Sequence, residues 1–217
     1  MEFKVIAHIH TDFPDKFGIP RQSAISEHLS GIITFLPEYR SMDAVRGLEG
    51  YDYIWLLWHF DVPQKDAFTA TVRPPRLGGN ERMGVFATRS PFRPNPIGLS
   101  CVKLDEIRTG RDGPQLIVSG IDLRDQTAIY DIKPYLPYAD AHPDAACGFA
   151  GQVQHQALQV IFPEHLQALL PPKKVPGAIE MLSQDPRPHY QDDPERIYGV
   201  SYAGVDIRFR IAGQICT

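Results

Sequence analysis

Apolar residues recur along the first part of the chain with spacings that predict strands. Phe3, Val5, Ala7 and Ile9 occupy every second position, and a period of two is typical of a half-buried strand. Further apolar runs predict strands in residues 31–36, 51–60, 115–123 and 128–132. The run 51–60 is aromatic and continuous, so we expect that strand to be buried on both faces.

Helical spacing is confined to short segments. Met42, Val45 and Leu48 recur every three residues and predict one short helix. Residues 163–170 begin with a proline and an acidic residue, as the first turn of a helix often does. Residues 153–162 predict a strand, and the proline-rich segment 171–177 predicts a stiff connector.

The last part of the chain has the pattern of a hairpin over residues 197–211, turning near Ala203 and Gly204. Its second arm separates apolar side chains from two arginines: Val205, Ile207, Phe209 and Ile211 on one side, Arg208 and Arg210 on the other. We interpret residues 151–217 as a small α+β domain that follows a body of residues 1–150, with the boundary near residue 150.

Composition narrows the fold class. The chain has 217 residues, 43% hydrophobic and 22% charged, which is enough for a real core. It contains 20 prolines, a share of about 9% against a usual 5%. Because proline is excluded from central strands and helix interiors, this favours a β-rich fold of short strands and stiff loops.

Other features exclude several classes of protein. No apolar run approaches the roughly 18 residues that span a membrane, and the first residues lack the pattern of a signal peptide. Cys101, Cys147 and Cys216 are odd in number and far apart, which favours reduced thiols in the cytoplasm and excludes paired-cysteine metal sites. We find no glycine-rich nucleotide loop, zinc-protease motif or nucleophile elbow.

The stretch 82–100 stands apart from this background. Val85 and Ala87 alternate as in a strand, and three prolines then follow at 91, 94 and 96. Residues 73–93 hold five arginines and a single acid, although the whole chain has a net charge of −4. A stiff loop that carries arginines suits the binding of a carboxylate, a phosphate or RNA.

Four segments in this order resemble one known family: residues 17–22 (FGIPRQ), 48–60, 73–100 and 128–140 (AIYDIKPYLPYAD). The chain is similar over residues 1–140 to the TsaA-like family of TrmO-type tRNA methyltransferases, and its tail is similar to their C-terminal extension. The resemblance implies a compact antiparallel β-barrel, unlike the doubly wound sheet, that binds S-adenosylmethionine and forms a homodimer. It also implies methylation of the exocyclic N6 of threonylcarbamoyladenosine, beside the anticodon of tRNA.

The resemblance assigns cofactor contacts by position: Pro20, Arg21, Gln22, His59, Phe60, Arg89, Leu99, Asp131, Ile132, Lys133 and Pro134. Side chains next to them are candidates for a general base: Asp131, Tyr135 and Tyr138. Lys133 or Arg93 is suited to hold the threonine carboxylate of the substrate. Candidate RNA contacts are basic residues of the loop and the tail: Arg73, Arg76, Arg93, Arg208 and Arg210.

Each assignment has an alternative in which the residue has no role in function. His59 can be a core histidine, the arginines can form a solvated face, and solvent or the substrate's own carboxylate can take the proton. A different class of function also fits: a non-catalytic barrel that binds S-adenosylmethionine, a nucleoside or RNA. A hydrolase is the weakest alternative, because the sequence offers no metal cluster to activate water.

Overall fold

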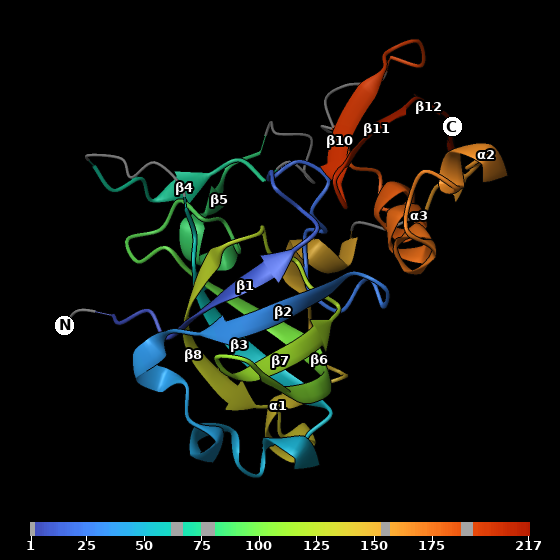
Figure 1. Ribbon diagram of the computed structural model, residues 1–217. Helices are drawn as coiled ribbons and strands as arrows, with labels where there is room; N and C mark the ends of the chain where they lie inside the picture. Colours follow the sequence, from blue (N-terminus) through green and yellow to red (C-terminus); the bar gives the residue numbers. More distant parts are fainter. Residues whose placement is uncertain (1–2, 62–66, 75–80, 153–156, 188–192) are drawn as a thin grey trace.

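The computed structural model describes residues 3–61, 67–74, 81–152, 157–187 and 193–217. Six strands form a closed antiparallel barrel in the order β1-β2-β7-β6-β3-β8 (Figure 1). Their bounds are β1 Ala7–Thr11, β2 Ser30–Phe35, β3 Tyr53–His59, β6 Ile97–Gly110, β7 Gly113–Ser119 and β8 Thr127–Pro134. The pairing of β8 with β1 closes the barrel. The β-rich fold and the barrel that the resemblance implied are therefore confirmed.

The interior of the barrel is filled by every second side chain of its strands. Buried residues with 0% exposure include Ile9, Ile33, Ile54 and Leu56. The period-two pattern therefore identifies the side chains that point inward, because successive side chains of a strand point to opposite faces. Gly98 is needed beneath the indole ring of Trp58, because a Cβ at Gly98 would lie 2.2 Å from Trp58 Cε2.

Strand β3 corrects the expectation of burial on both faces. Ile54, Leu56 and Trp58 point into the barrel, whereas Trp55 and Leu57 between them are only half-buried. The alternation was hidden in the sequence because the outer positions are apolar as well. Two other strands are shorter than expected: β1 begins at Ala7, and β7 ends at Ser119, before Gly120 turns the chain at a φ of 77°.

The stretch 82–88 is also not the strand that its alternation predicted. Only β5 (Met83–Gly84) is extended, and it pairs with β4 (Thr71–Val72). Residues Val85–Ala87 form the 3-10 turn η5. The backbone N–H and the hydroxyl of Thr88 both donate to the carbonyl of Val85, at 3.2 and 2.9 Å, which closes a turn in place of a strand ladder.

The remaining elements of the first 152 residues are single turns: η1 Pro37–Tyr39, η2 Met42–Val45, η3 Leu48–Gly50, α1 Pro137–Asp140 and η6 Gly148–Gln152. The helix expected over 42–48 is therefore wrong in its continuity. Gly47, at a φ of 86°, separates η2 from η3 and breaks the helical path.

The C-terminal part contains short helices and strands: β9 Gln159–Val160, α2 Glu164–Gln167, η7 Pro172–Lys174, α3 Val175–Ser183, β10 Tyr198–Tyr202, β11 Val205–Phe209, β12 Ile211–Ala212 and β13 Ile215–Cys216. The hairpin is confirmed, with Ala203 and Gly204 at positive φ in its turn. The prediction of a stiff connector over 171–177 is wrong. Its prolines lie in the first turns of η7 and α3, where the backbone needs no amide donor. Part of the strand expected over 153–162 lies outside the described residues.

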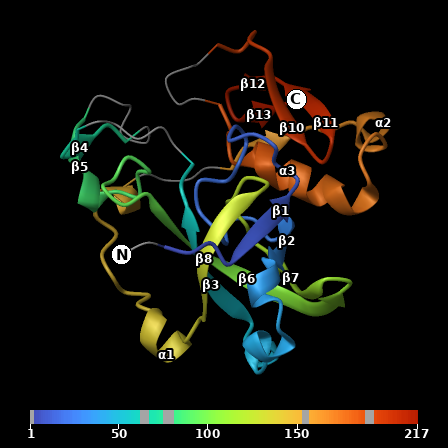
Figure 2. The same cartoon turned by 60° about the vertical axis from the view of Figure 1, so that its left-hand side comes forward.

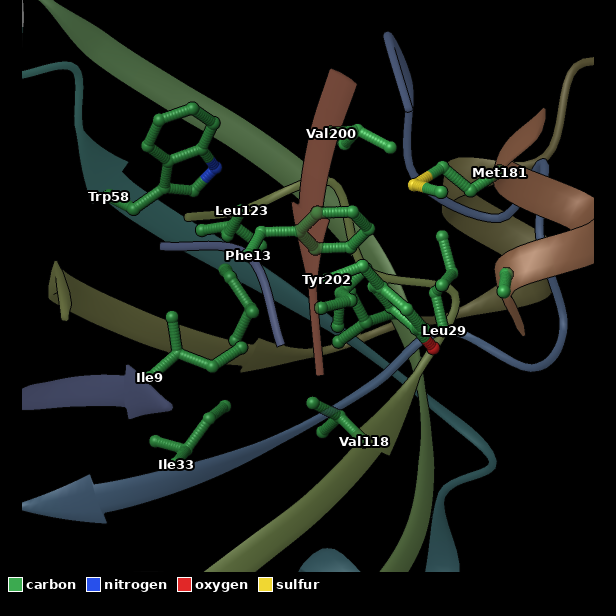
Figure 3. Close-up of a cluster of buried hydrophobic side chains, with 14 of the residues drawn as sticks. Ile9, Phe13, Leu29, Ile33, Trp58, Val118, Leu123, Met181, Val200 and Tyr202 are labelled. Carbon is green, nitrogen blue, oxygen red and sulfur yellow. The ribbon is translucent and has the colours of Figure 1, made fainter. Parts of the chain in front are cut away.

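The C-terminal part packs on one end of the barrel (Figures 1 and 2). The ring of Tyr202 lies beside Phe13, with centroids 5.2 Å apart, in a cluster that also includes Leu29 and Met181 (Figure 3). Lys174 Nζ lies 2.5 Å from Asp12 Oδ2. The two parts of the chain thus share one continuous core, and the predicted boundary near residue 150 remains a prediction.

Candidate active site

The outer face of β6, β3 and β8 brings several predicted cofactor contacts together. In the register of these strands, Leu57 pairs with Leu99 on one side and with Asp131 on the other. Directly paired residues lie on the same face of a sheet. Leu99 is 50% exposed, so this outer face combines an apolar surface on β6 and β3 with the Asp131 carboxylate on β8.

A bulge in β8 shapes one edge of this face. The pairing with β3 shifts between Leu57 and Trp58, and Tyr130 is the extra residue. Its hydroxyl lies 2.8 Å from Nδ1 of His59, and the two rings meet edge to face. The backbone of Phe60 donates to the carbonyl of Pro96 at 2.8 Å. Bulges re-aim side chains in this way, and here the bulge gives His59 a polar partner at the end of β3.

The next residues of β8 form a charged pair on the same face. Lys133 Nζ lies 2.9 Å from Asp131 Oδ2, and the backbone N–H of Ile132 donates to Asp131 Oδ1 at 2.9 Å. Asp131 and Lys133 are 44% and 62% exposed, so both side chains are accessible to a ligand. Ile132 pairs with Leu56 and is partly buried, while Pro134 pairs with Ile54.

Aromatic side chains border the face beyond Lys133. The ring of Tyr135 packs against Tyr53 and Trp55, and the indole N–H of Trp55 donates to Asp140 at 2.9 Å. Tyr138, on helix α1, is 88% exposed. Of the three candidates for a general base, Asp131 lies in the apolar face, Tyr135 lies at its border and Tyr138 projects into solvent.

The loop that contains Pro20, Arg21 and Gln22 lies along the free edge of β6. The amide of Cys101 donates to the hydroxyl of Ser23 at 3.0 Å, at a point where β7 no longer pairs with β6. The guanidinium of Arg89 donates to Gln22 Oε1. This contact joins two predicted cofactor segments that are far apart in the sequence.

Pro20 and Arg21 line a separate hollow. A pocket of about 210 Å³ lies between residues 16–25 and the end of α3, with Met181, Gln184 and Asp185 on its far side. It contains none of the residues of the outer face of β3. The structure therefore brings four of the predicted contacts to that face: His59, Leu99, Asp131 and Lys133. It pairs Ile132 and Pro134 with inward-facing residues of β3 and sets Pro20 and Arg21 beside this second pocket.

A buried polar chain behind the face was missed from the sequence. The indole N–H of Trp58 donates to Ser100 Oγ at 2.9 Å, and the Ser100 hydroxyl donates to Asp122 Oδ1 at 2.5 Å. Burial raises the pKa of Asp122 to about 6, against the opposing effects of Ser100, the Ser23 backbone and Arg89. The one signal in the sequence was an acid within the apolar run 115–123.

The predicted RNA contacts are dispersed. Arg93 donates to the carbonyl oxygens of Thr88 and Ser90 at 2.8 and 3.4 Å, so part of its guanidinium holds its own loop. Arg73 is exposed, and Arg76 lies outside the described residues. Two arginines of the tail have acidic neighbours: Arg208 lies 3.3 Å from Asp206, and Arg210 lies 3.7 Å from Glu195.

Metal sites and membrane-spanning helices are both absent from the described residues. Within the described part of the chain, no group of three or more His, Cys, Asp or Glu side chains has the arrangement of a metal site. In the same residues, no helix has the length and apolar character that a membrane span needs. The three cysteines are free thiols.

These features define an antiparallel β-barrel whose candidate small-molecule site lies on its outer wall, since buried side chains fill the interior. The chain belongs to the TrmO family. The family model of the tRNA-methyltransferase O N-terminal domain matches residues 8–141, and that of the TrmO C-terminal domain matches residues 155–217. The membership expected from the sequence is thereby confirmed.

Relatives support this membership over nearly the whole chain. The tRNA (adenine(37)-N6)-methyltransferase of Escherichia coli is 40% identical, covering 97% of this chain and 93% of the relative. A putative S-adenosylmethionine-dependent methyltransferase RcsF of Pseudomonas aeruginosa is 43% identical, covering 94% and 90%. A crystal structure of TrmO matches with a TM-score of 0.78 at 34% identity, covering 100% of this chain and 96% of the other.

Proposed function

We propose that this protein transfers a methyl group from S-adenosylmethionine to N6 of the adenosine at position 37 of tRNA. The observation that carries the proposal is the register of β6, β3 and β8, which sets Leu99 and Asp131 on either side of Leu57 on one outer face. The names of the relatives, a tRNA (adenine(37)-N6)-methyltransferase among them, support the reaction.

The residues of the face fit the chemical groups of this cofactor. The exposed side of Leu99 offers an apolar surface to the adenine. The Asp131 carboxylate can accept from ribose hydroxyls or from the ammonium group. Arg89 donates to Gln22 and still has N–H groups for the methionine carboxylate, since a guanidinium carries five. When bound, S-adenosylmethionine supplies an electrophilic methyl group.

Asp131 is our candidate for the general base. The exocyclic nitrogen has its lone pair delocalised into the purine, so it must lose its proton as the methyl group is transferred. Asp131 is an accessible carboxylate on the proposed cofactor face, and a positioned base typically contributes about 10²–10⁴-fold. Tyr135 and Tyr138 are the other candidates, the first held by ring contacts and the second in solvent.

Lys133 is our candidate for the contact that recognises the modified base. A threonylcarbamoyl group adds a carboxylate to the adenosine. The Lys133 ammonium, paired with Asp131 at 2.9 Å, is a 62% exposed cation on the same face. Arg93 is less suited, because it already donates to two carbonyl oxygens of its own loop. The protein is therefore expected to prefer tRNA that carries threonylcarbamoyladenosine.

The reaction is tested with purified protein, S-adenosylmethionine and two tRNA samples, one with the threonylcarbamoyl modification and one without it. Mass spectrometry of digested nucleosides should show one added methyl group on the modified base alone. Lys133→Met should raise KM for the modified tRNA, whereas Asp131→Asn should lower kcat. Lys103→Met and Asp105→Asn are matched controls, because these two residues form a similar exposed pair, 3.2 Å apart, on β6.

Two results would separate the parts of this proposal. Equal methylation of both tRNA samples would overturn the requirement for the threonylcarbamoyl group and leave the methyl transfer intact. Wild-type rates in Asp131→Asn, Tyr135→Phe and Tyr138→Phe would overturn the assignment of a base. Absence of any methyl transfer, together with binding of the cofactor by calorimetry, would favour the non-catalytic barrel.

The assembly and location are part of the same proposal. We infer a homodimer in the cytoplasm, since an anticodon arm is large beside the outer face of a single small barrel, and two copies would double the positive field that attracts phosphate. Light scattering at micromolar concentration should give twice the 24.4 kDa mass of one chain. Arg73→Ala should lower the salt dependence of tRNA binding by about one unit of slope.

A further inference from the structure

Two phenylalanine rings stand side by side on the surface near the stiff loop. Phe68 and Phe86 stack with centroids 6.2 Å apart and an interplanar angle of 23°. They are 60% and 72% exposed. The guanidinium carbon of Arg93 lies 5.9 Å from the centroid of the Phe86 ring. We call Phe68, Phe86 and Arg93 the aromatic platform.

The backbone beneath the platform is held in place. The amide of Val85 donates to the carbonyl of Ala70 at 2.9 Å, which ties η5 to the segment that follows Phe68. Val85 itself is 1% exposed and anchors the turn from below. Thr88 closes the turn through its hydroxyl. Phe86 is therefore presented outward by a fixed turn.

The charge around the platform suits a polyanion. Residues 67–74 and 81–93 contain four arginines and one acid, Glu81, in a chain whose net charge is −4. Exposed aromatic rings flanked by arginine are how proteins bind unpaired nucleotides, since each base can stack and each phosphate can be neutralised. A partner protein bound through apolar contact would not need this excess of positive charge.

The platform is also close to the proposed cofactor residues. Phe86 precedes Arg89 by three residues, and Arg89 donates to Gln22. Strand β4 follows Phe68 along the chain, and β5 precedes Phe86. In Figures 1 and 2, these two strands project from the barrel on the side away from helices α2 and α3. A base that stacks there belongs to nucleotides near the reacting one.

We propose that the aromatic platform stacks an unpaired base of the anticodon loop next to the target adenosine. This rests on the proposed function and extends it, because neither the family resemblance nor the names of the relatives assign Phe68 or Phe86 a role. Phe86 and Phe68 supply the stacking surface, and Arg93 supplies a cation against the ring and the neighbouring phosphate.

The test measures binding of a fluorescein-labelled anticodon stem-loop RNA by anisotropy. Phe68→Ala and Phe86→Ala should each weaken binding by about 5-fold to 150-fold, the range typical of a lost base stack. Phe86→Tyr, which keeps the aromatic face, should bind like the wild type, and Phe86→Leu should bind like the alanine variant. Met42→Ala, an exposed apolar residue on η2, is the control and should change nothing.

Other measurements distinguish this surface from the alternatives. Calorimetry with S-adenosylmethionine should give wild-type affinity in all platform variants. Cross-linking of wild-type protein to RNA with 5-iodouridine in the loop should map to Phe68 or Phe86, and needs no variant to fold. The proposal would be overturned if Phe86→Leu bound RNA as tightly as the wild type. It would also be overturned if the platform variants lost the dimer mass with unchanged RNA affinity, and that result would assign the rings to a contact between copies. Failure of methyl transfer by the wild type would instead count against the proposed function.

Discussion

The two faces of strand β3 carry apolar side chains of similar size and yet differ in what they do. Ile54 and Leu56 are 0% exposed inside the barrel. Trp55 and Leu57, one position away, lie on the outer wall, where Leu57 has Leu99 and Asp131 as its paired neighbours. Natural strands usually keep one face polar when that face meets water. The apolar residues of this outer face are therefore the feature from which we propose that it binds the cofactor.

The two faces are connected through polar atoms. Trp58 fills the interior, and its indole N–H leads through Ser100 to Asp122, whose carboxylate also accepts from the backbone of Ser23. Ser23 in turn holds the edge of β6 beside the outer face. The interior thus determines the position of the loop that contributes Gln22 to the proposed site.

The largest effect should come from the interior. Leu56→Ala should lower the free energy of unfolding by about 2–5 kcal/mol, because a fully buried leucine leaves a cavity when truncated. The same truncation one residue away, Leu57→Ala, removes a half-buried side chain and should cost less. Urea unfolding of both variants measures the difference. Equal losses would contradict the assignment of the two faces.

The second effect depends on pH. The pKa of Asp122 is raised to about 6, above its usual value near 4. Between those values the folded protein binds more protons than the unfolded chain, so the contribution of Asp122 to stability falls as the pH rises through this window. The Asp122→Asn variant has no carboxyl group at this position, so it lacks this pH-dependent contribution to stability. Its stability relative to the wild type should rise by at most about 3 kcal/mol from pH 4 to pH 7.

Urea unfolding of the wild type and Asp122→Asn at several pH values gives that difference directly. Asp112→Asn is the matched control, because the Asp112 side chain is 74% exposed on a surface turn. A pH profile that is identical for the wild type and Asp122→Asn would show that Asp122 keeps an ordinary titration in the fold.

The sequence could predict much of the interior and little of the connections between distant strands. Period-two spacing marked the strands, and the apolar pattern on either side of Ala203 and Gly204 marked the hairpin, whose turn has positive φ at both residues. The spacing did not predict the burial of β3, because alternation of burial cannot be read from a sequence in which both faces are apolar. It failed again at 85–87, because Thr88 closes a turn through a hydrogen bond that no spacing reveals.

The candidate site likewise depends on contacts between distant strands that the sequence does not reveal. The residues of the outer face could be named only through a family resemblance, since no short motif carries them. Their meeting depends on the register of β6, β3 and β8, which are separated along the chain. Asp122 was missed because a lone acid after an apolar run is not distinctive, and its burial follows from the distant Ser23 and Ser100.

Two buried hydroxyl groups should differ in how much their removal changes stability. Ser100 is 0% exposed and its hydroxyl both accepts and donates, so Ser100→Ala should cost about 1–3 kcal/mol by leaving the Trp58 N–H unpaired. The Tyr202 hydroxyl is buried without a hydrogen-bond partner among the described residues. Tyr202→Phe should therefore change stability by less than about 1 kcal/mol, in the stabilising direction. A large loss in Tyr202→Phe would contradict the assignment of this hydroxyl as unpaired.

The smallest effect on stability should occur on the outer face. Leu99 is 50% exposed, so Leu99→Ala should change the free energy of unfolding by no more than about 0.5 kcal/mol, as is usual for surface substitutions. Its affinity for S-adenosylmethionine should nevertheless fall measurably in calorimetry, because the proposed adenine contact loses apolar area at about 25 cal/mol per Å². Ile32→Ala is the control, a residue of β2 that is 36% exposed and lies outside the proposed site. If Leu99→Ala lost stability and kept its affinity, the exposed leucine would have a structural role, and the contrast between the two faces would lose its functional meaning.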